Sequence, residues 1–266
     1  MCESRPIIIE RQRITRPGQL GLGFTPDDGV GLWQPREYVV RDCIIDLSAL
    51  PLDMLDEAAA VTWGASAVFL RCVIRGAGKL ILCGSGDPKK AALEAGKRVV
   101  FEHCILEDFG RRGVEAQAGM RVTLKNCLVR NWGKTSRHTV RDFASWAHGG
   151  GRIDAVGTVF WQDRFLRPLH QFWGDLAAHI GQAWNDYGWR GLLRIDTYLP
   201  GVCRALLAGP GGTAWAWRCW RNRWWVVLPL RHTTAMMPKC EALALIAELE
   251  QMAATLDAEL PPASAD

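Results

Sequence analysis

Short β-strands are the elements that the hydrophobic pattern predicts most clearly between residues 37 and 161. Val99 and Phe101 are apolar and lie two positions apart, and Val122 and Leu124 repeat this spacing further along the chain. A period of two places alternate side chains on one face of an extended strand. After each of these segments the chain bends and continues into a second short apolar run. The pattern therefore predicts pairs of short strands.

These strand pairs belong to an internal repeat. The repeat aligns on residues that lie 23 to 32 positions apart, namely Cys43, Cys72, Cys104, Cys127 and Thr158. Periods of this length are typical of solenoids, propellers and arrays. None of the units contains an amphipathic helical pattern of about ten residues, which disfavours leucine-rich and helical repeats. We therefore predict a mainly β fold, a parallel β-helix whose equivalent side chains stack in inward rows.

The residue before each aligned cysteine is polar: Asp42, Arg71, His103 and Asn126. Polar residues at such positions favour a bend between two strands. We interpret His103 and Asn126 as corner residues of the coils rather than as members of a functional site.

The pattern changes after about residue 163. We expect a β-helix over residues 1–163 and a tryptophan-rich α+β segment over 164–266. Apolar spacing predicts helices near 168–185 and 239–258. Between them lie β-like runs, at 191–199, 202–207, 213–220 and 224–228. Within the first part, residues 55–60 resemble a short helical turn.

Eight of the 13 tryptophans fall between residues 173 and 225. Trp215 and Trp217 alternate along one predicted strand, so they share a face. Two interpretations stay open. The rings can form a packed core and interface, or they can form a platform that stacks on sugars or contacts a protein partner or a second copy of the chain.

Composition narrows the class of protein. A net charge of +4 favours an acidic partner only weakly, and arginines scattered among the tryptophans are too few to predict nucleic-acid binding. An apolar run long enough to span a membrane is absent, so we expect no membrane partner.

The nine cysteines form no CxxC pair and predict reduced core thiols. With no hydrophobic signal core at the start, we expect a cytoplasmic location, with a non-standard export route as the alternative.

One stretch resembles a known enzyme family. It runs from Lys79-Leu80-Ile81-Leu82-Cys83-Gly84-Ser85-Gly86-Asp87 through Gly96-Lys97-Arg98-Val99 and His103 to Arg111-Arg112. In order and spacing these motifs are similar to those of the pectate lyases. That resemblance implies a right-handed parallel β-helix and the cleavage of an acidic, uronate-containing polysaccharide by β-elimination.

The resemblance also implies roles for individual residues. Lys79 matches the lysine that binds the substrate carboxylate, and Arg112 matches the arginine that acts as the base. Arg111, Gln117 and Asp87 fall at substrate-binding positions, although Gln117 replaces an arginine of the family motif. The family's proline position is Val114 here.

The family uses Ca²⁺, held by carboxylates, to neutralise the uronate. The carboxylates nearest the matching positions are Asp42, Asp56 and Glu57, whose spacing differs from the family's. Separately, His138, Asp142 and His148 lie in one glycine-rich stretch and are a weaker candidate for a metal site. The alternative function is a catalytically inactive β-helix that serves as a glycan-binding module or as a structural part of a phage or other assembly.

Overall fold

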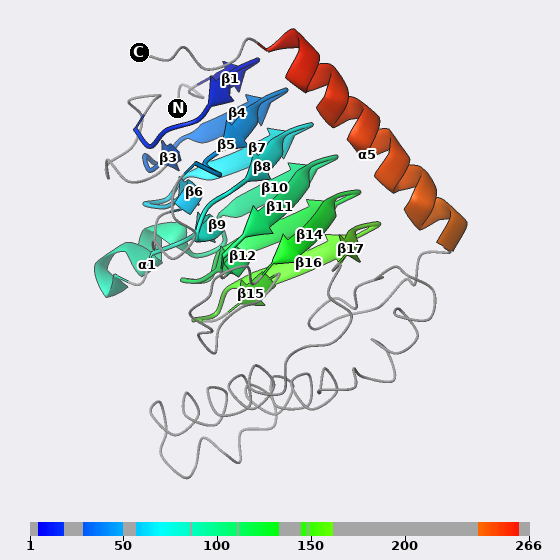
Figure 1. The fold of residues 1–266 in the computed structure, drawn as a ribbon. Helices are drawn as coiled ribbons and strands as arrows, with labels where there is room; N and C mark the ends of the chain where they lie inside the picture. Colours follow the sequence, from blue (N-terminus) through cyan, green and yellow to red (C-terminus); the bar gives the residue numbers. More distant parts are fainter. Residues whose placement is uncertain are drawn as a thin grey trace.

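The computed structural model describes residues 5–18, 29–49, 57–85, 87–110, 112–132, 145–147, 149–161 and 239–260. In these ranges the chain forms a parallel β-helix with one long helix lying along its side (Figure 1). The predicted parallel β-helix is therefore confirmed. Among the described residues, no helix is both long and apolar enough to cross a membrane. The boundary near residue 163, the helix near 168–185 and the β-like runs after it lie outside the described residues.

Three parallel sheets form the walls of the β-helix. Each coil contributes one strand to each sheet in turn, except that the last described coil adds strands only to sheets A and B. Sheet A has six strands, β1 (Ile7–Glu10), β4 (Glu37–Arg41), β7 (Ser66–Leu70), β10 (Arg98–Glu102), β13 (Arg121–Lys125) and β16 (Arg152–Val156). Sheet B has six, β2 (Arg13–Ile14), β5 (Ile44–Asp46), β8 (Val73–Arg75), β11 (Ile105–Phe109), β14 (Leu128–Trp132) and β17 (Val159–Trp161). Sheet C has five, β3 (Val30–Leu32), β6 (Glu57–Val61), β9 (Lys79–Cys83), β12 (Arg112–Ala116) and β15 (Ser145–Ala147).

The polar residue before each aligned cysteine forms the corner between sheets A and B. Asp42, Arg71, His103 and Asn126 all have positive φ angles, between 50° and 53°. This left-handed conformation costs most residues about 1–2 kcal/mol, and asparagine and aspartate adopt it most easily. The predicted corners are confirmed.

Directly after each corner, a small polar side chain points into the coil and closes the turn. The Cys72 thiol donates to the carbonyl oxygens of Val40 and Leu70, each at 3.4 Å, and Cys104 and Cys127 repeat this arrangement one and two coils later. Thr158 substitutes its hydroxyl for the thiol in the next coil. The four aligned cysteines are free and buried, as expected for core thiols; they are Cys43, Cys72, Cys104 and Cys127.

The interior rows predicted from the alternation are present. Val99, Phe101, Val122 and Leu124 are all fully buried, and Phe101 stacks on Phe69 of the neighbouring coil with ring centroids 4.7 Å apart. Adjacent strands lie about 4.8 Å apart, so each interior side chain packs on its equivalent above and below.

The helical turn expected at residues 55–60 is wrong for its described part, because Glu57–Val61 forms strand β6. Ala58 to Val61 are buried on both faces of the strand, so no alternation marks it in the sequence. A short helix that was not predicted, α1 (Pro88–Glu94), follows sheet C strand β9. The Asp87 side chain caps it by accepting from the Lys89 backbone N–H at 2.9 Å.

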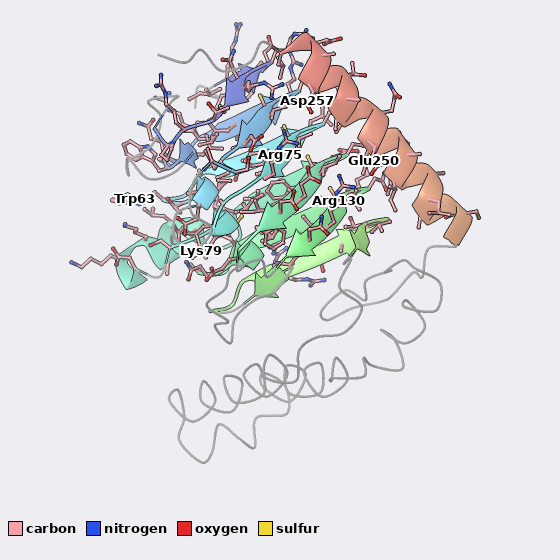
Figure 2. All side chains as sticks on the ribbon, viewed as in Figure 1. Trp63, Arg75, Lys79, Arg130, Glu250 and Asp257 are labelled. Atoms are coloured by element: carbon pink, nitrogen blue, oxygen red, sulfur yellow. The ribbon has the colours of Figure 1, made fainter. Side chains whose placement is uncertain are left out.

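The long helix α5 (Lys239–Glu259) confirms the helix predicted near 239–258 and covers the outer face of sheet B (Figures 1 and 2). That face carries an apolar row with one residue from each of five strands, namely Ile44, Val73, Ile105, Leu128 and Val159. Ala242, Leu249, Leu256 and Leu260 pack against it. Removing both apolar surfaces from water is the main force that holds α5 in place.

Candidate functional site

The residues matched to the catalytic pair meet at the start of neighbouring strands in sheet C. Lys79 begins β9, and Arg112 begins β12 directly opposite Lys79 in the register. Glu57 begins β6 and lies opposite Lys79 on its other side. In a parallel sheet, the backbones of such neighbours lie about 4.8 Å apart across the strands. The fold thus forms one row, Glu57–Lys79–Arg112, from residues up to 55 positions apart.

Lys79 is engaged by a carboxylate in this structure. Its Nζ lies 2.6 Å from Oε1 of Glu57, and their side chains are only 19% and 12% exposed. A charge-assisted hydrogen bond of this length, partly shielded from water, fixes the ammonium group in place. The row can therefore present a positioned cation beside the arginine position, which is an arrangement suited to binding an anionic group.

The predicted substrate-binding residues lie at the opposite end of the same strands. Gln117 follows the end of β12, and its side-chain amide donates to the Gly84 carbonyl oxygen at 3.0 Å, just beyond the end of β9. Asp87 caps α1 nearby. A five-residue strand spans roughly 13 Å between its first and last residues, so the fold does not bring Gln117 and Asp87 to the row. Arg111 lies outside the described residues.

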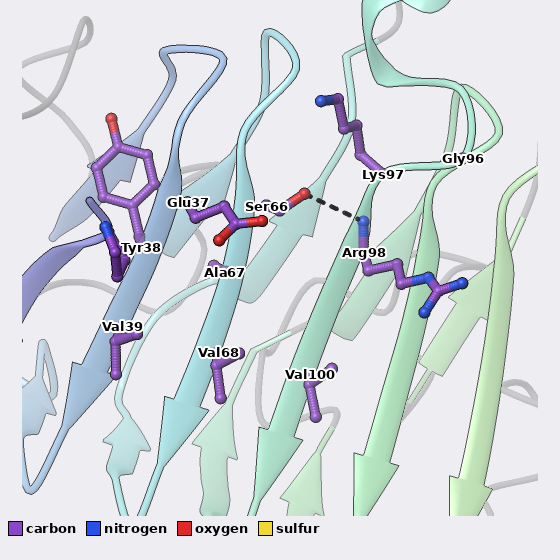
Figure 3. A pocket seen from close by; sticks show the side chains of 11 residues that line it. Glu37, Tyr38, Val39, Ser66, Ala67, Val68, Gly96, Lys97, Arg98 and Val100 are labelled. Carbon is purple, nitrogen blue, oxygen red and sulfur yellow. Dashed lines mark hydrogen bonds between the residues drawn. The ribbon is translucent and has the colours of Figure 1, made fainter. Parts of the chain in front are cut away.

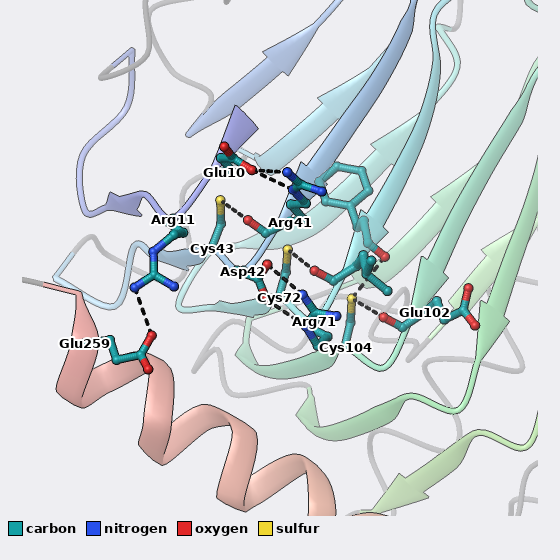
Figure 4. A network of polar contacts seen from close by, with 12 residues as sticks. Glu10, Arg11, Arg41, Asp42, Cys43, Arg71, Cys72, Glu102, Cys104 and Glu259 are labelled. Carbon is teal, nitrogen blue, oxygen red and sulfur yellow. Dashed lines mark hydrogen bonds and ion pairs between the residues drawn. The ribbon is translucent and has the colours of Figure 1, made fainter. Parts of the chain in front are cut away.

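The described carboxylates do not make a calcium site. Asp42 lies at the corner between sheets A and B and accepts two hydrogen bonds of 2.7 Å from Arg71 (Figure 4). Glu57 is paired with Lys79. Within the described ranges, no three histidine, cysteine, aspartate or glutamate side chains cluster as metal ligands. Because Ca²⁺ requires about six to eight oxygen ligands, these residues do not fit it. Asp56, His138, Asp142 and His148 lie outside the described residues.

A polar and aromatic cluster that the sequence reasoning missed surrounds α1. Glu94, fully buried, accepts from the backbone N–H groups of Trp63 at 2.8 Å and Ser85 at 2.7 Å. Lys90 places its ammonium 3.7 Å from the centre of the Trp63 ring. These contacts anchor the loop after β9 to the loop after β6. The sequence signal for the helix was Asp87 followed by Pro88, a typical helix start.

The outer face of sheet A carries a hollow of about 400 Å³ that the sequence reasoning also missed (Figure 3). Its floor is formed by Val39, Val68 and Val100, and Lys97 and Arg98 lie along one side. The signal in the sequence was the valine at the equivalent position of three successive sheet A strands, at positions 39, 68 and 100.

Comparisons with protein-family models, with curated proteins and with solved structures find no match to this chain. The chemistry that the site supports is therefore inferred from its own residues. A lysine, a carboxylate and an arginine position in one row favour recognition of an anion, and the β-helix presents that row on a rigid sheet.

Proposed function

We propose that the protein binds an acidic, uronate-containing polysaccharide at the row Glu57–Lys79–Arg112 and cleaves it by β-elimination. The supporting observation is the register that sets Arg112 directly opposite Lys79 on the next strand of a parallel β-helix. The motif resemblance to the pectate lyases gives these two residues matching roles, and the fold is compatible with that family.

Each residue of the row has a defined part in this reaction. The Lys79 ammonium exchanges Glu57 for the uronate carboxylate and thereby makes the proton on C5 more acidic. Arg112 accepts that proton. The C5–H electron pair forms the C4–C5 double bond while the C4–O bond to the leaving sugar breaks, and water protonates the leaving oxygen. Because the pKa of an arginine exceeds about 12, we expect the rate to rise at alkaline pH. No step is assigned to Ca²⁺.

The test is the ultraviolet absorbance of unsaturated uronate products during incubation with polygalacturonate at alkaline pH, with calcium or with chelator. We expect absorbance to rise, and Arg112→Ala to abolish the rise. Arg41→Ala is the matched control, because Arg41 is a half-exposed sheet A arginine paired with Glu10. A flat trace from folded protein, or equal loss in both variants, would reject the proposal for this substrate.

A second candidate is a β-helix that binds an acidic glycan without cleaving it. The poor fit of the described carboxylates to calcium favours it, because the family uses that cation for cleavage. Calorimetric binding of polygalacturonate that Lys79→Ala weakens, with no ultraviolet product, would support this candidate over the lyase. A contact role for the tryptophans between 173 and 225 stays a prediction, since they lie outside the described residues.

A further inference from the structure

The outer face of sheet A carries an apolar row that no described element covers, whereas α5 covers the outer face of sheet B (Figure 1). The row has one residue from each of four neighbouring strands, namely Ile8, Val39, Val68 and Val100. Ile8 is 54% exposed and Val68 is 36% exposed. Neighbouring aliphatic side chains that are open to water on a sheet face are typical of an interaction surface. The charges around the row decide which occupant fits it.

These charges change sign from one side of β7 to the other. At the starts of the strands, Glu37 on β4 and Arg98 on β10 lie one strand to either side of β7 (Figure 3). Both are exposed, and neither forms an ion pair with another described residue. At the ends of the same strands, Arg41 on β4 and Glu102 on β10 flank Leu70 of β7. Each acidic residue on one side therefore has a basic counterpart at the same distance on the other side.

The inversion continues one strand further out. Glu10 on β1 and Lys125 on β13 lie two strands to either side of β7 and have opposite charges. Within the chain, Glu10 pairs with Arg41, as Figure 4 shows, and Lys125 pairs with Glu102 at 2.6 Å. The charges at this end of sheet A thus form two ion pairs, one on each side of β7, in which the order of the signs is the same along the sheet.

A face whose charges invert about one strand is complementary to a second copy of itself. A two-fold rotation about an axis along β7 reverses the order of the strands but keeps their direction. In the resulting face-to-face arrangement, β4 of one copy lies over β10 of the other, and β1 lies over β13. Glu37 then faces Arg98 of the second copy, and Arg41 faces Glu102. The outer pair, on β1 and β13, is matched in the same way.

The apolar centre of the face is also self-complementary. Val68 and Leu70 lie on the axis and face their own counterparts, and Val39 faces Val100. Packed sheets lie about 10 Å apart, so these side chains meet at the centre while the longer charged ones span the gap around them. Five strands of about five residues cover roughly 20 Å by 15 Å. This is less than the about 800 Å² that each partner buries in stable interfaces, which is typical of reversible association.

We propose that two copies of the chain form a reversible two-fold symmetric dimer through the outer faces of sheet A, centred on β7. The charges also select this register. Moving the axis by half a strand toward β10 places Arg41 over Lys125, and moving it toward β4 places Glu10 over Glu102. Such like-charge contacts disfavour the shifted arrangements. The proposal is independent of the proposed lyase function, because the candidate site lies on sheet C.

Sedimentation equilibrium of the full chain measures the dissociation constant of the dimer. Glu37→Arg and Arg98→Glu each place like charges at two symmetric contacts, so each is expected to raise this constant about tenfold or more. An equimolar mixture of the two variants should recover the wild-type constant, because both contacts of a mixed dimer again join opposite charges. The double variant should recover it as well, since it exchanges the two charges and keeps the net charge of the wild type.

Val68→Lys tests the centre of the interface. It places two ammonium groups together on the two-fold axis, so we expect it to abolish the dimer. The matched control is Val156→Lys, at a valine that is 59% exposed on the same face. Val156 lies on β16, which has no counterpart in a dimer centred on β7, so the expected change is below about twofold. Circular dichroism establishes that each variant is folded.

Three results would overturn the proposal. A wild-type chain that stays monomeric at every concentration measured would leave this face to a different partner. A dimer that Val68→Lys leaves unchanged would form through another part of the molecule. Single variants that weaken the dimer but do not recover on mixing would indicate another orientation of the two copies. Net charge alone is distinguished as well, because it would make Glu37→Arg and Arg98→Glu shift the constant in opposite directions.

Discussion

Glu250 on α5 lies 2.8 Å from Arg130 on β14, although the two residues are 120 positions apart in the sequence. Arg130 also donates from Nε to Glu107, at 2.6 Å. The Glu107 side chain is only 8% exposed, whereas that of Glu250 is 52% exposed. Arg130 therefore joins a nearly buried carboxylate of the β-helix to an exposed carboxylate of the helix that covers it.

Arg130→Ala is expected to lower the free energy of unfolding by about 3 kcal/mol, because it removes the closest partner of a nearly buried carboxylate. Glu250→Ala removes only an exposed partner and should cost below about 1 kcal/mol. Urea denaturation of both variants measures the difference. Equal losses would mean that Glu107 relies on Arg75, whose guanidinium is 3.6 Å away, rather than on Arg130.

Asp46 makes stability depend on pH. Burial opposes its ionisation, but hydrogen bonds from Ser48 and Arg75 outweigh this, so the pKa of Asp46 is below its usual value. A lowered folded-state pKa contributes stability above the unfolded-state value of about 4, and that stability is lost as the pH falls through the folded-state pKa. Asp46→Asn should therefore destabilise the protein at neutral pH by about 1 kcal/mol. The difference from the wild type should shrink below about pH 4, and a constant difference in acid titrations would contradict the assignment.

The stacked cysteines are expected to be unreactive in the folded protein. Burial is the main cause that raises the pKa of Cys72 and Cys104 well above the usual thiol value. Iodoacetamide should modify exposed Cys240 but leave Cys72 and Cys104 unmodified at about pH 8.5, where a free thiol is half ionised. Peptide mass spectrometry identifies the modified sites, with urea-unfolded protein as the control. Native labelling of Cys72 at the rate of Cys240 would show that the coils open.

The corner at Asn126 has a left-handed backbone, with φ at 51°. Asn126→Gly should be neutral or slightly stabilising, because glycine adopts positive φ without a steric penalty. Asn126→Val should cost about 2 kcal/mol, because a β-branched residue is strained there. Thermal unfolding of the two variants provides the comparison. Similar melting temperatures would show that the corner relaxes to another conformation.

Glu57 distinguishes two roles for the row in sheet C. If Lys79 binds the uronate, Glu57→Gln frees its ammonium group, and binding of polygalacturonate should tighten by several-fold, about 1 kcal/mol. If Glu57 instead contacts the glycan itself, the same substitution should weaken binding. Titration calorimetry with and without chelator separates these outcomes, and Glu37→Gln, an exposed sheet A position, is the control.

The interior of the β-helix could be predicted because it depends on short-range patterns. Val99 and Phe101 differ by two positions, and the polar residue before each aligned cysteine marks a corner within one coil. Strand β6 escaped prediction because its alanines are buried on both faces and show no alternation. The placement of the candidate site was predictable only in part: Lys79 and Arg112 meet in register, but Gln117 and Asp87 lie at the far end of the same strands.

Local sequence patterns are sufficient to specify the coils of the β-helix. A repeat that places apolar side chains at equivalent positions can bury them only by stacking, so the β-helix, its inward rows and its corners follow from local spacing. The contacts made on the outer faces of the sheets depend instead on the tertiary structure. The pairing of Lys79 with Glu57 and the packing of α5 on sheet B each depend on strand register and on contacts between distant segments. No local pattern encodes these contacts, because loops of different lengths separate the strands that make them.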